Sequence, residues 1–177
     1  MAFNKYSELN VLLCQVLFTE QNRNRPAYIE LDEETRSLLA ESIECSSEEV
    51  IPHIQRVTSL HYAGLTRPGG FFQMAAKSIL RWRKEVLQDS SLAYPELPLL
   101  VCLTTAASDM GGDSEFNSLA YYPRLAAILD VVEKDDLADS YRDHSNFLWS
   151  NWNYWLDSVL NSERGIGTSY SIGSAKH

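Results

Sequence analysis

The sequence predicts an all-α fold, an irregular bundle of about seven helices that ends in a short extended, strand-like tail. Two observations predict the helices: apolar residues recur at helical spacing, and capping residues or Pro and Gly breaks divide the chain into short segments. A third, 45% hydrophobic and 22% charged residues among 177, is typical of one globular domain. We therefore expect a single helical domain over residues 1–161 and a Gly/Ser-rich tail over residues 162–177.

The first three predicted helices are marked by capping residues. Ser7 is expected to cap the first helix, in which leucine and valine recur on one face. Asp32 is expected to cap the second helix, whose opening turn holds two glutamates as the helix dipole favours. The third helix is expected to begin at Ser46 or Ser47, and Pro52 then either lies in its first turn or kinks it.

The later helices are separated by loops. Residues 67–70, Arg-Pro-Gly-Gly, predict a hinge or tight corner, and a long helix from about 71 to 88 follows them. Residues 99–110 are apolar nearly all round, so they predict the central buried helix. Pro123 is expected to open a further helix, and the last helix is expected to begin near Ser145.

Three of the four tryptophans lie within residues 147–156. On a helical wheel Trp149, Trp152 and Trp155 fall on one apolar arc, which predicts burial. Phe147 and Tyr154 lie seven residues apart amid the polar arc, on a face that the core packing of this helix does not explain. They are therefore candidate protein-contact residues, which meet either a second layer of the fold or another molecule.

The C-terminal residues 164–174 alternate larger and small side chains, as a strand or an extended arm does. Ile166, Tyr170 and Ile172 are further candidate protein-contact residues on this arm. A lone strand needs a partner from elsewhere in the chain, from a second copy, or from sequence beyond His177. A plain flexible terminus is the alternative.

The overall charge and the cysteines limit the function classes. The formal net charge of −9 disfavours a protein whose whole surface binds nucleic acid or anionic lipid. Cys14, Cys45 and Cys102 lack a metal-type spacing and are interpreted as reduced packing thiols, which indicates the cytoplasm. The N-terminus lacks a signal-peptide layout, and no apolar run approaches the roughly 20 residues of a membrane helix. We expect a cytoplasmic location and no membrane partner.

No coherent catalytic constellation is visible, so an enzyme is not favoured and no cofactor is expected. The four histidines have neither H-x-x-x-H spacing nor a nearby cysteine pair, so no metal site is expected. His61 lies on an apolar face, where a hydrogen-bonded core histidine is the expected role. Gly165 to Gly167 resemble part of a phosphate-binding glycine loop without its strand, helix or G-K-[ST]. An enzyme with a phosphate site in this tail is a further alternative.

The helix expected over residues 71–88 carries the only concentrated positive surface of the sequence. Lys77, Arg81 and Lys84 project from one side of it. Arg83 adjoins them on the apolar arc, where we expect it to snorkel or to bond a carboxylate across a helix contact. These four are candidate nucleic-acid or anion contacts. The alternatives are a protein partner and pairing with the many acids of the N-terminal third, which also disfavour bound phosphates.

Several phrases of the sequence prompt a family resemblance: Leu97 to Gly111, Tyr121 to Leu125, and Leu148 to Leu156, ahead of Arg164. Together they resemble the N-terminal helical region of large uncharacterised bacterial proteins found among mobile-element and phage-defence genes. The resemblance spans roughly residues 95–175 and rests on packing and turn residues. It implies a multidomain protein whose later portion is missing from this sequence and which acts in an assembly, with no catalytic residue to transfer.

The sequence as a whole favours a non-catalytic helical interaction or scaffold module of a bacterial cytoplasmic assembly, with phage defence implied by the resemblance. We expect a protein partner or self-association through the 147/154 face and the tail. The alternative is a nucleic-acid-associated helical domain that uses the basic face of residues 71–88.

Overall fold

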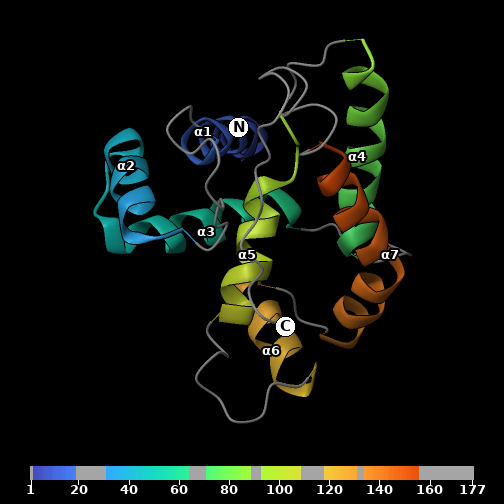
Figure 1. The fold of residues 1–177 in the computed structure, drawn as a ribbon. Helices are drawn as coiled ribbons and strands as arrows, with labels where there is room; N and C mark the ends of the chain where they lie inside the picture. The colour runs from blue at the N-terminus through green and yellow to red at the C-terminus, as the bar shows by residue number, and fades with distance from the viewer. Residues whose placement is uncertain are drawn as a thin grey trace.

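The computed structural model describes residues 2–18, 31–63, 71–88, 93–108, 118–130 and 134–155. Within these ranges the chain is all-helical, with seven α-helices, one short 3-10 helix and no strand, so the predicted fold class is confirmed at this level (Figure 1). The elements are α1 (Ala2–Leu17), α2 (Glu33–Ile43), η2 (Ser47–Glu49), α3 (Val50–Tyr62), α4 (Phe71–Val86), α5 (Leu97–Ser108), α6 (Ser118–Ile128) and α7 (Lys134–Tyr154). The predicted tail over residues 162–177 lies outside the described residues.

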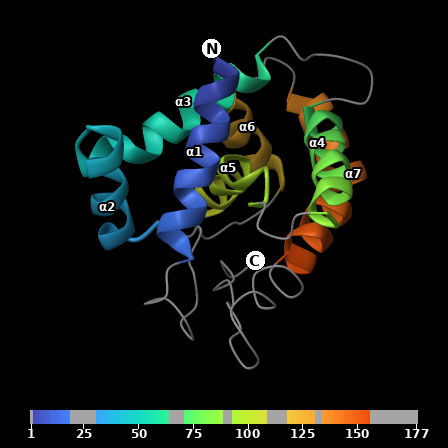
Figure 2. The same ribbon diagram turned by 90° about the horizontal axis from the view of Figure 1, so that it is seen from above.

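Helix α5 forms the centre of the fold, as its all-round apolar sequence predicts. Nine of its twelve residues are buried, and it lies among the other helices in both views (Figures 1 and 2). The helix begins at Leu97 rather than Leu99 and ends at Ser108. Pro98 therefore lies in the first turn, where a missing backbone N–H leaves no helical hydrogen bond unmade.

Helices α4 and α7 lie side by side and form the opposite end of the molecule from α2 (Figures 1 and 2). The backbone N–H of Phe72 donates to Ser140 Oγ at 2.9 Å, and Arg83 Nη1 donates to Asn151 Oδ1 at 2.9 Å. Both hydrogen bonds join residues 68 positions apart, so the two helices run parallel in a fixed register. The Ser140 hydroxyl thus satisfies one of the free donors in the first turn of α4.

The predicted caps of the N-terminal half are confirmed. Asp32 accepts a hydrogen bond from the backbone N–H of Thr35 at 2.8 Å and so closes the start of α2. The N–H of Ser46 donates to Glu49 Oε2 at 2.9 Å at the start of η2, which continues into α3. Pro52 lies in the first turn of α3, which is the first of the two predicted alternatives.

Three predicted helix starts are wrong because tertiary contacts extend the helices toward their N-termini, and the first two are those of α1 and α6. Helix α1 begins at Ala2, so Ser7 lies inside it, and the turn before Ser7 is held by the buried ring of Tyr6. Helix α6 begins at Ser118, so Pro123 is an internal residue. Its first turns are held to α5 by Tyr121, whose hydroxyl donates to the carbonyl oxygen of Leu103 at 3.1 Å.

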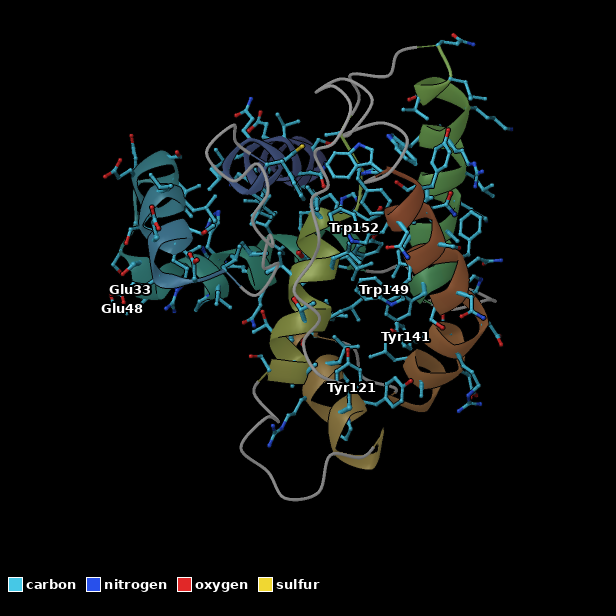
Figure 3. All side chains as sticks on the ribbon, in the orientation of Figure 1. Glu33, Glu48, Tyr121, Tyr141, Trp149 and Trp152 are labelled. Carbon is cyan, nitrogen blue, oxygen red and sulfur yellow. The ribbon has the colours of Figure 1, made fainter. Side chains whose placement is uncertain are left out.

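The tryptophan helix also begins earlier than predicted, at Lys134 rather than near Ser145. Its polar first half still buries Leu137 and Ser140, and the Trp149 indole N–H donates to the hydroxyl of Tyr141 at 3.0 Å (Figure 3). In its second half Leu148 and Trp152 are buried and Trp149 is half-buried, and Trp155, directly after the helix, is also buried. The predicted burial of the apolar arc is confirmed for these residues. None of the helices in the described ranges has the length and apolar character needed to cross a bilayer.

Candidate functional site

The outward side of α4 combines positive charge with exposed leucines. The inward side of this helix consists of buried residues at heptad spacing: Phe72, Ala75, Ile79, Trp82 and Val86. Lys77, Arg81 and Lys84 are exposed on the other side. Leu80 is 48% exposed and Leu87 is 77% exposed between and beyond them. We call these five exposed residues the α4 strip.

The positive charge of the α4 strip is not neutralised within the described part of the chain. No ion pair joins Lys77, Arg81 or Lys84 to any acidic side chain described there. The acids of α2 and η2, which include Glu33 and Glu48, lie at the far end of the molecule from α4 (Figures 1 and 3). The alternative in which these N-terminal acids pair with the basic face within one chain therefore has no support in the geometry.

Arg83, the fourth predicted basic contact, has a different environment from the other three. It donates to the amide oxygen of Asn151, and its guanidinium carbon lies 4.7 Å from the centre of the Tyr154 ring. The predicted carboxylate partner is thus an amide, and the interhelical contact itself is as expected. Arg83 therefore stabilises the α4/α7 pair.

The two predicted contact residues of α7 are half-buried. Phe147 and Tyr154 both pack against the hydrophobic core, and Tyr154 is covered in part by Arg83. Helix α4 thus supplies a second layer for the Tyr154 face, and a contact with another molecule stays a prediction. The other predicted contact residues, Ile166, Tyr170 and Ile172, lie outside the described residues, as does the glycine-rich segment 165–167.

A buried acid lies at the junction of three helices, at a position that no sequence motif marks as functional. Glu96 directly precedes α5, and its Oε2 accepts hydrogen bonds from the hydroxyls of Tyr6 in α1 at 2.6 Å and Tyr62 in α3 at 2.5 Å. Asn10 braces the same segment: its Nδ2 donates to the carbonyl oxygen of Tyr94 at 2.6 Å, and its Oδ1 accepts from the N–H of Leu97 at 2.8 Å. We call Glu96, Tyr6, Tyr62 and Asn10 the Glu96 centre.

Burial dominates the electrostatics of the Glu96 centre. It raises the pKa of Glu96 to about 7 despite the opposing hydrogen bonds from Tyr6 and Tyr62. Burial and the nearby carboxyl also raise the pKa values of both tyrosines well above their ordinary range. The His61 ring stacks on Tyr6 with 3.9 Å between ring centres, and burial lowers the pKa of His61. Below pH 7 the centre is therefore largely uncharged.

The sequence contains one signal for the Glu96 centre. Tyr6 precedes Leu9, Leu13 and Leu17 at helical spacing, which places a polar hydroxyl on the buried face of α1. A buried hydroxyl requires a partner, and Glu96 is a lone acid at the start of the most apolar helix. Only the packing of α1, α3 and α5 against one another shows that Tyr6 and Glu96 are partners.

The cysteines and His144 take part in packing and local contacts and form no reactive cluster among the described residues. All three cysteines are free, and burial raises the pKa of Cys102 to about 12, so its thiol is unreactive at neutral pH. The Nδ1 of His144 lies 2.8 Å from the carbonyl oxygen of Ser140 in its own helix. Among the described residues no group of three His, Cys, Asp or Glu side chains is arranged to hold a metal ion.

Comparisons with known proteins found no matching family model, no matching curated protein and no matching solved structure. The arrangement of the described residues itself thus supplies the functional argument. The Glu96 centre joins buried parts of three helices, whereas the α4 strip presents charge and apolar area to the outside.

Proposed function

We propose that this chain is a non-catalytic helical interaction module, of the scaffold type, that binds a protein partner through the α4 strip. The observation that carries the proposal is the pairing of three unneutralised cations on the rigid helix α4 with two exposed leucines, Leu80 on the same helix and Leu87 directly after its end. Exposed apolar side chains among charges are typical of contact surfaces. A role in a bacterial cytoplasmic assembly, including phage defence, is part of the proposal and rests on the sequence resemblance alone.

The rigidity of α4 supports the α4 strip as the partner-binding surface. Its inward residues are buried, and Arg83 and the N–H of Phe72 fix it to α7 at both ends. A preformed helix face loses little conformational entropy when a partner binds. The half-buried Phe147 and Tyr154 adjoin the same helix pair and contribute to this contact from α7.

Site-specific photo-crosslinking in cells tests the proposal. A photoreactive residue in place of Leu87 is expected to give a discrete protein adduct that Lys77→Glu with Lys84→Glu removes. The matched control is the same residue in place of Leu60, a 57% exposed leucine on α3, which is expected to give no such adduct. Equal labelling from both positions, or no adduct from position 87, contradicts the proposal.

Nucleic acid is the second candidate partner, because Lys77, Arg81 and Lys84 lack acidic partners in the described part of the chain. This alternative requires affinity for an oligonucleotide that falls steeply with salt. The fluorescence anisotropy of labelled single- and double-stranded oligonucleotides, measured with the wild type and the Lys77→Glu/Lys84→Glu variant, tests it. Equal binding by the two proteins excludes the α4 strip as a nucleic-acid site.

A further inference from the structure

Helix α2 carries an exposed strip that is the acidic counterpart of the α4 strip. Glu34, Leu38 and Glu41 lie at i, i+4 and i+7, so they share one face of the helix, and all three are exposed. Leu38 is 48% exposed, while Leu39 and Ala40 hold the other face of α2 to the core. We call Glu34, Leu38 and Glu41 the α2 strip.

The two strips have the same length and opposite charge, and each has a leucine between its two outer charges, at i+4 in the α2 strip and at i+3 in the α4 strip. Lys77 and Lys84 are seven residues apart, as are Glu34 and Glu41. At the rise of an α-helix, the two charges of each strip are therefore about 10 Å apart along the helix axis. A leucine of the same exposure, 48%, lies between the charges in each strip. Two such faces can bring carboxylates to ammonium groups and leucine against leucine.

Few opposing charges interrupt either strip. On α2 the basic residue Arg36 is half-buried and lies toward the core side. On α4 the exposed acid Glu85 directly follows Lys84, and Arg81 adds a further positive charge one turn before it. The net sign of each exposed face is therefore clear: negative on α2 and positive on α4.

The strips cannot meet within one molecule. Helices α2 and α4 lie at opposite ends of the described structure in both views (Figures 1 and 2). Helix α2 packs on α1, η2 and α3, whereas α4 packs on α7. Any contact between the two strips must therefore join two molecules.

We propose that one copy of this chain binds the next head to tail, with the α4 strip of one copy against the α2 strip of the other. This inference rests on the proposed interaction function and names a second copy as the partner. The interface is heterologous, so each bound pair retains a free strip at either end, and association extends into an open chain or closes into a ring. Two short helix faces form a small interface, so association is reversible and falls with salt.

The test is the mass of the full chain by light scattering as a function of concentration, at about 0.05 M and about 0.5 M salt. The wild type is expected to exceed its monomer mass of 20.1 kDa at low salt and to return toward it at high salt. Two variants reverse one strip each: Lys77→Glu/Lys84→Glu on α4 and Glu34→Lys/Glu41→Lys on α2. Each is expected to associate about tenfold or more weakly than the wild type.

The decisive sample is an equimolar mixture of the two reversed variants. In this mixture the unchanged α4 strip of one variant meets the unchanged α2 strip of the other, so association is expected to return. All four reversed side chains are exposed, and matching thermal unfolding curves verify that the folds are intact. The salt dependence of the wild-type mass tests the proposal without any variant, so it does not depend on how the variants fold.

Three outcomes overturn the head-to-tail proposal: a wild type that stays monomeric at low salt, reversed variants that associate like the wild type, and a mixture that stays monomeric. The proposed interaction function fails separately. A monomeric chain that still gives a protein adduct from position 87 overturns the self-association alone, whereas the loss of both readouts overturns the two proposals together. Association that nuclease treatment abolishes is a fourth outcome that overturns the head-to-tail proposal, because nucleic acid then links the copies.

Discussion

The hydroxyl of Tyr62 donates to Glu96 Oε2 at 2.5 Å and joins the last turn of α3 to the start of α5. Tyr6 of α1 donates to the same oxygen at 2.6 Å, so one buried carboxyl links three helices. Burial makes this carboxyl costly to ionise, even though the hydrogen bonds from both tyrosines favour its ionised form. The stability of the fold is therefore coupled to pH through Glu96.

The pH prediction concerns Glu96→Gln. Burial raises the pKa of Glu96 from its ordinary value of 4.5 to about 7 in the folded protein. A raised carboxyl pKa gives stability that is fully present below pH 4.5 and is lost as the pH rises through 7, at a total of about 3 kcal/mol. The glutamine variant lacks this loss, so its free energy of unfolding relative to wild type is expected to increase by about that amount between pH 4.5 and pH 9.

Urea unfolding of both proteins across this pH range measures the difference. At each pH, the free energy of unfolding of the wild type is subtracted from that of the variant. This removes the effects of the other titrating groups, including His61, whose lowered pKa favours folding at higher pH. A matched control is Glu49→Gln: the Ser46 hydrogen bonds lower the pKa of this exposed acid, so its contribution is lost as the pH falls. A difference curve for Glu96→Gln that is flat with pH would contradict the buried-acid account.

A second prediction concerns the donors of the Glu96 centre. Tyr62→Phe removes a hydrogen bond that favours the ionised carboxylate, so the pKa of Glu96 is expected to rise further. The loss of the buried hydrogen bond is expected to lower the free energy of unfolding by about 1–3 kcal/mol. Carbon-13 NMR titration of the glutamate carboxyl measures the pKa. A pKa that is unchanged or lower argues against donation by Tyr62.

A third prediction concerns the α4/α7 contact. Arg83→Ala removes the hydrogen bond to Asn151 and the cation–π contact with Tyr154, and it is expected to cost about 1 kcal/mol of stability. The matched control is Lys77→Ala on the same helix, which is expected to change stability by less than about 0.5 kcal/mol. Denaturant midpoints of the two variants compare them directly. Equal midpoints contradict a structural role for Arg83.

A fourth prediction concerns Asn10, whose side chain satisfies two buried backbone groups beside Glu96. Asn10→Ala leaves the carbonyl oxygen of Tyr94 and the N–H of Leu97 without these hydrogen bonds, at an expected cost of about 2–4 kcal/mol. Asn153→Ala, at an exposed position of α7, is expected to be near neutral. Thermal unfolding of both variants is the measurement, and a mild effect at position 10 would contradict the bracing role.

Local signals in the sequence predicted much of the fold. The Asp32 cap, the serine start of η2, the buried helix α5 and the tryptophan arc all depend on contacts within a few residues, or on hydrophobic periodicity. The wrong starts of α1, α6 and α7 share one cause. In each case the extra turns are held by contacts with distant helices, such as the hydrogen bond from Tyr121 to Leu103.

The candidate site was predicted in part. Helical periodicity placed Lys77, Arg81 and Lys84 on one exposed face, as the structure has them. The wheel also placed Arg83 on the apolar arc, but only the parallel register of α4 and α7 brings it to Asn151 and Tyr154. Leu80 and Leu87 were not recognised as exposed, because the direction of the core from α4 depends on where α7 lies.

Contact between the α4 strip and a protein partner is expected to cover the exposed leucines of the strip. Hydroxyl-radical footprinting of the wild-type chain tests it most directly, because the labelling of a leucine side chain follows its exposure. We compare dilute purified protein with protein in concentrated cell extract. We expect Leu80 and Leu87 to become protected in the extract, while Leu60 keeps its labelling. Unchanged labelling of Leu80 and Leu87 would contradict a partner contact at the α4 strip.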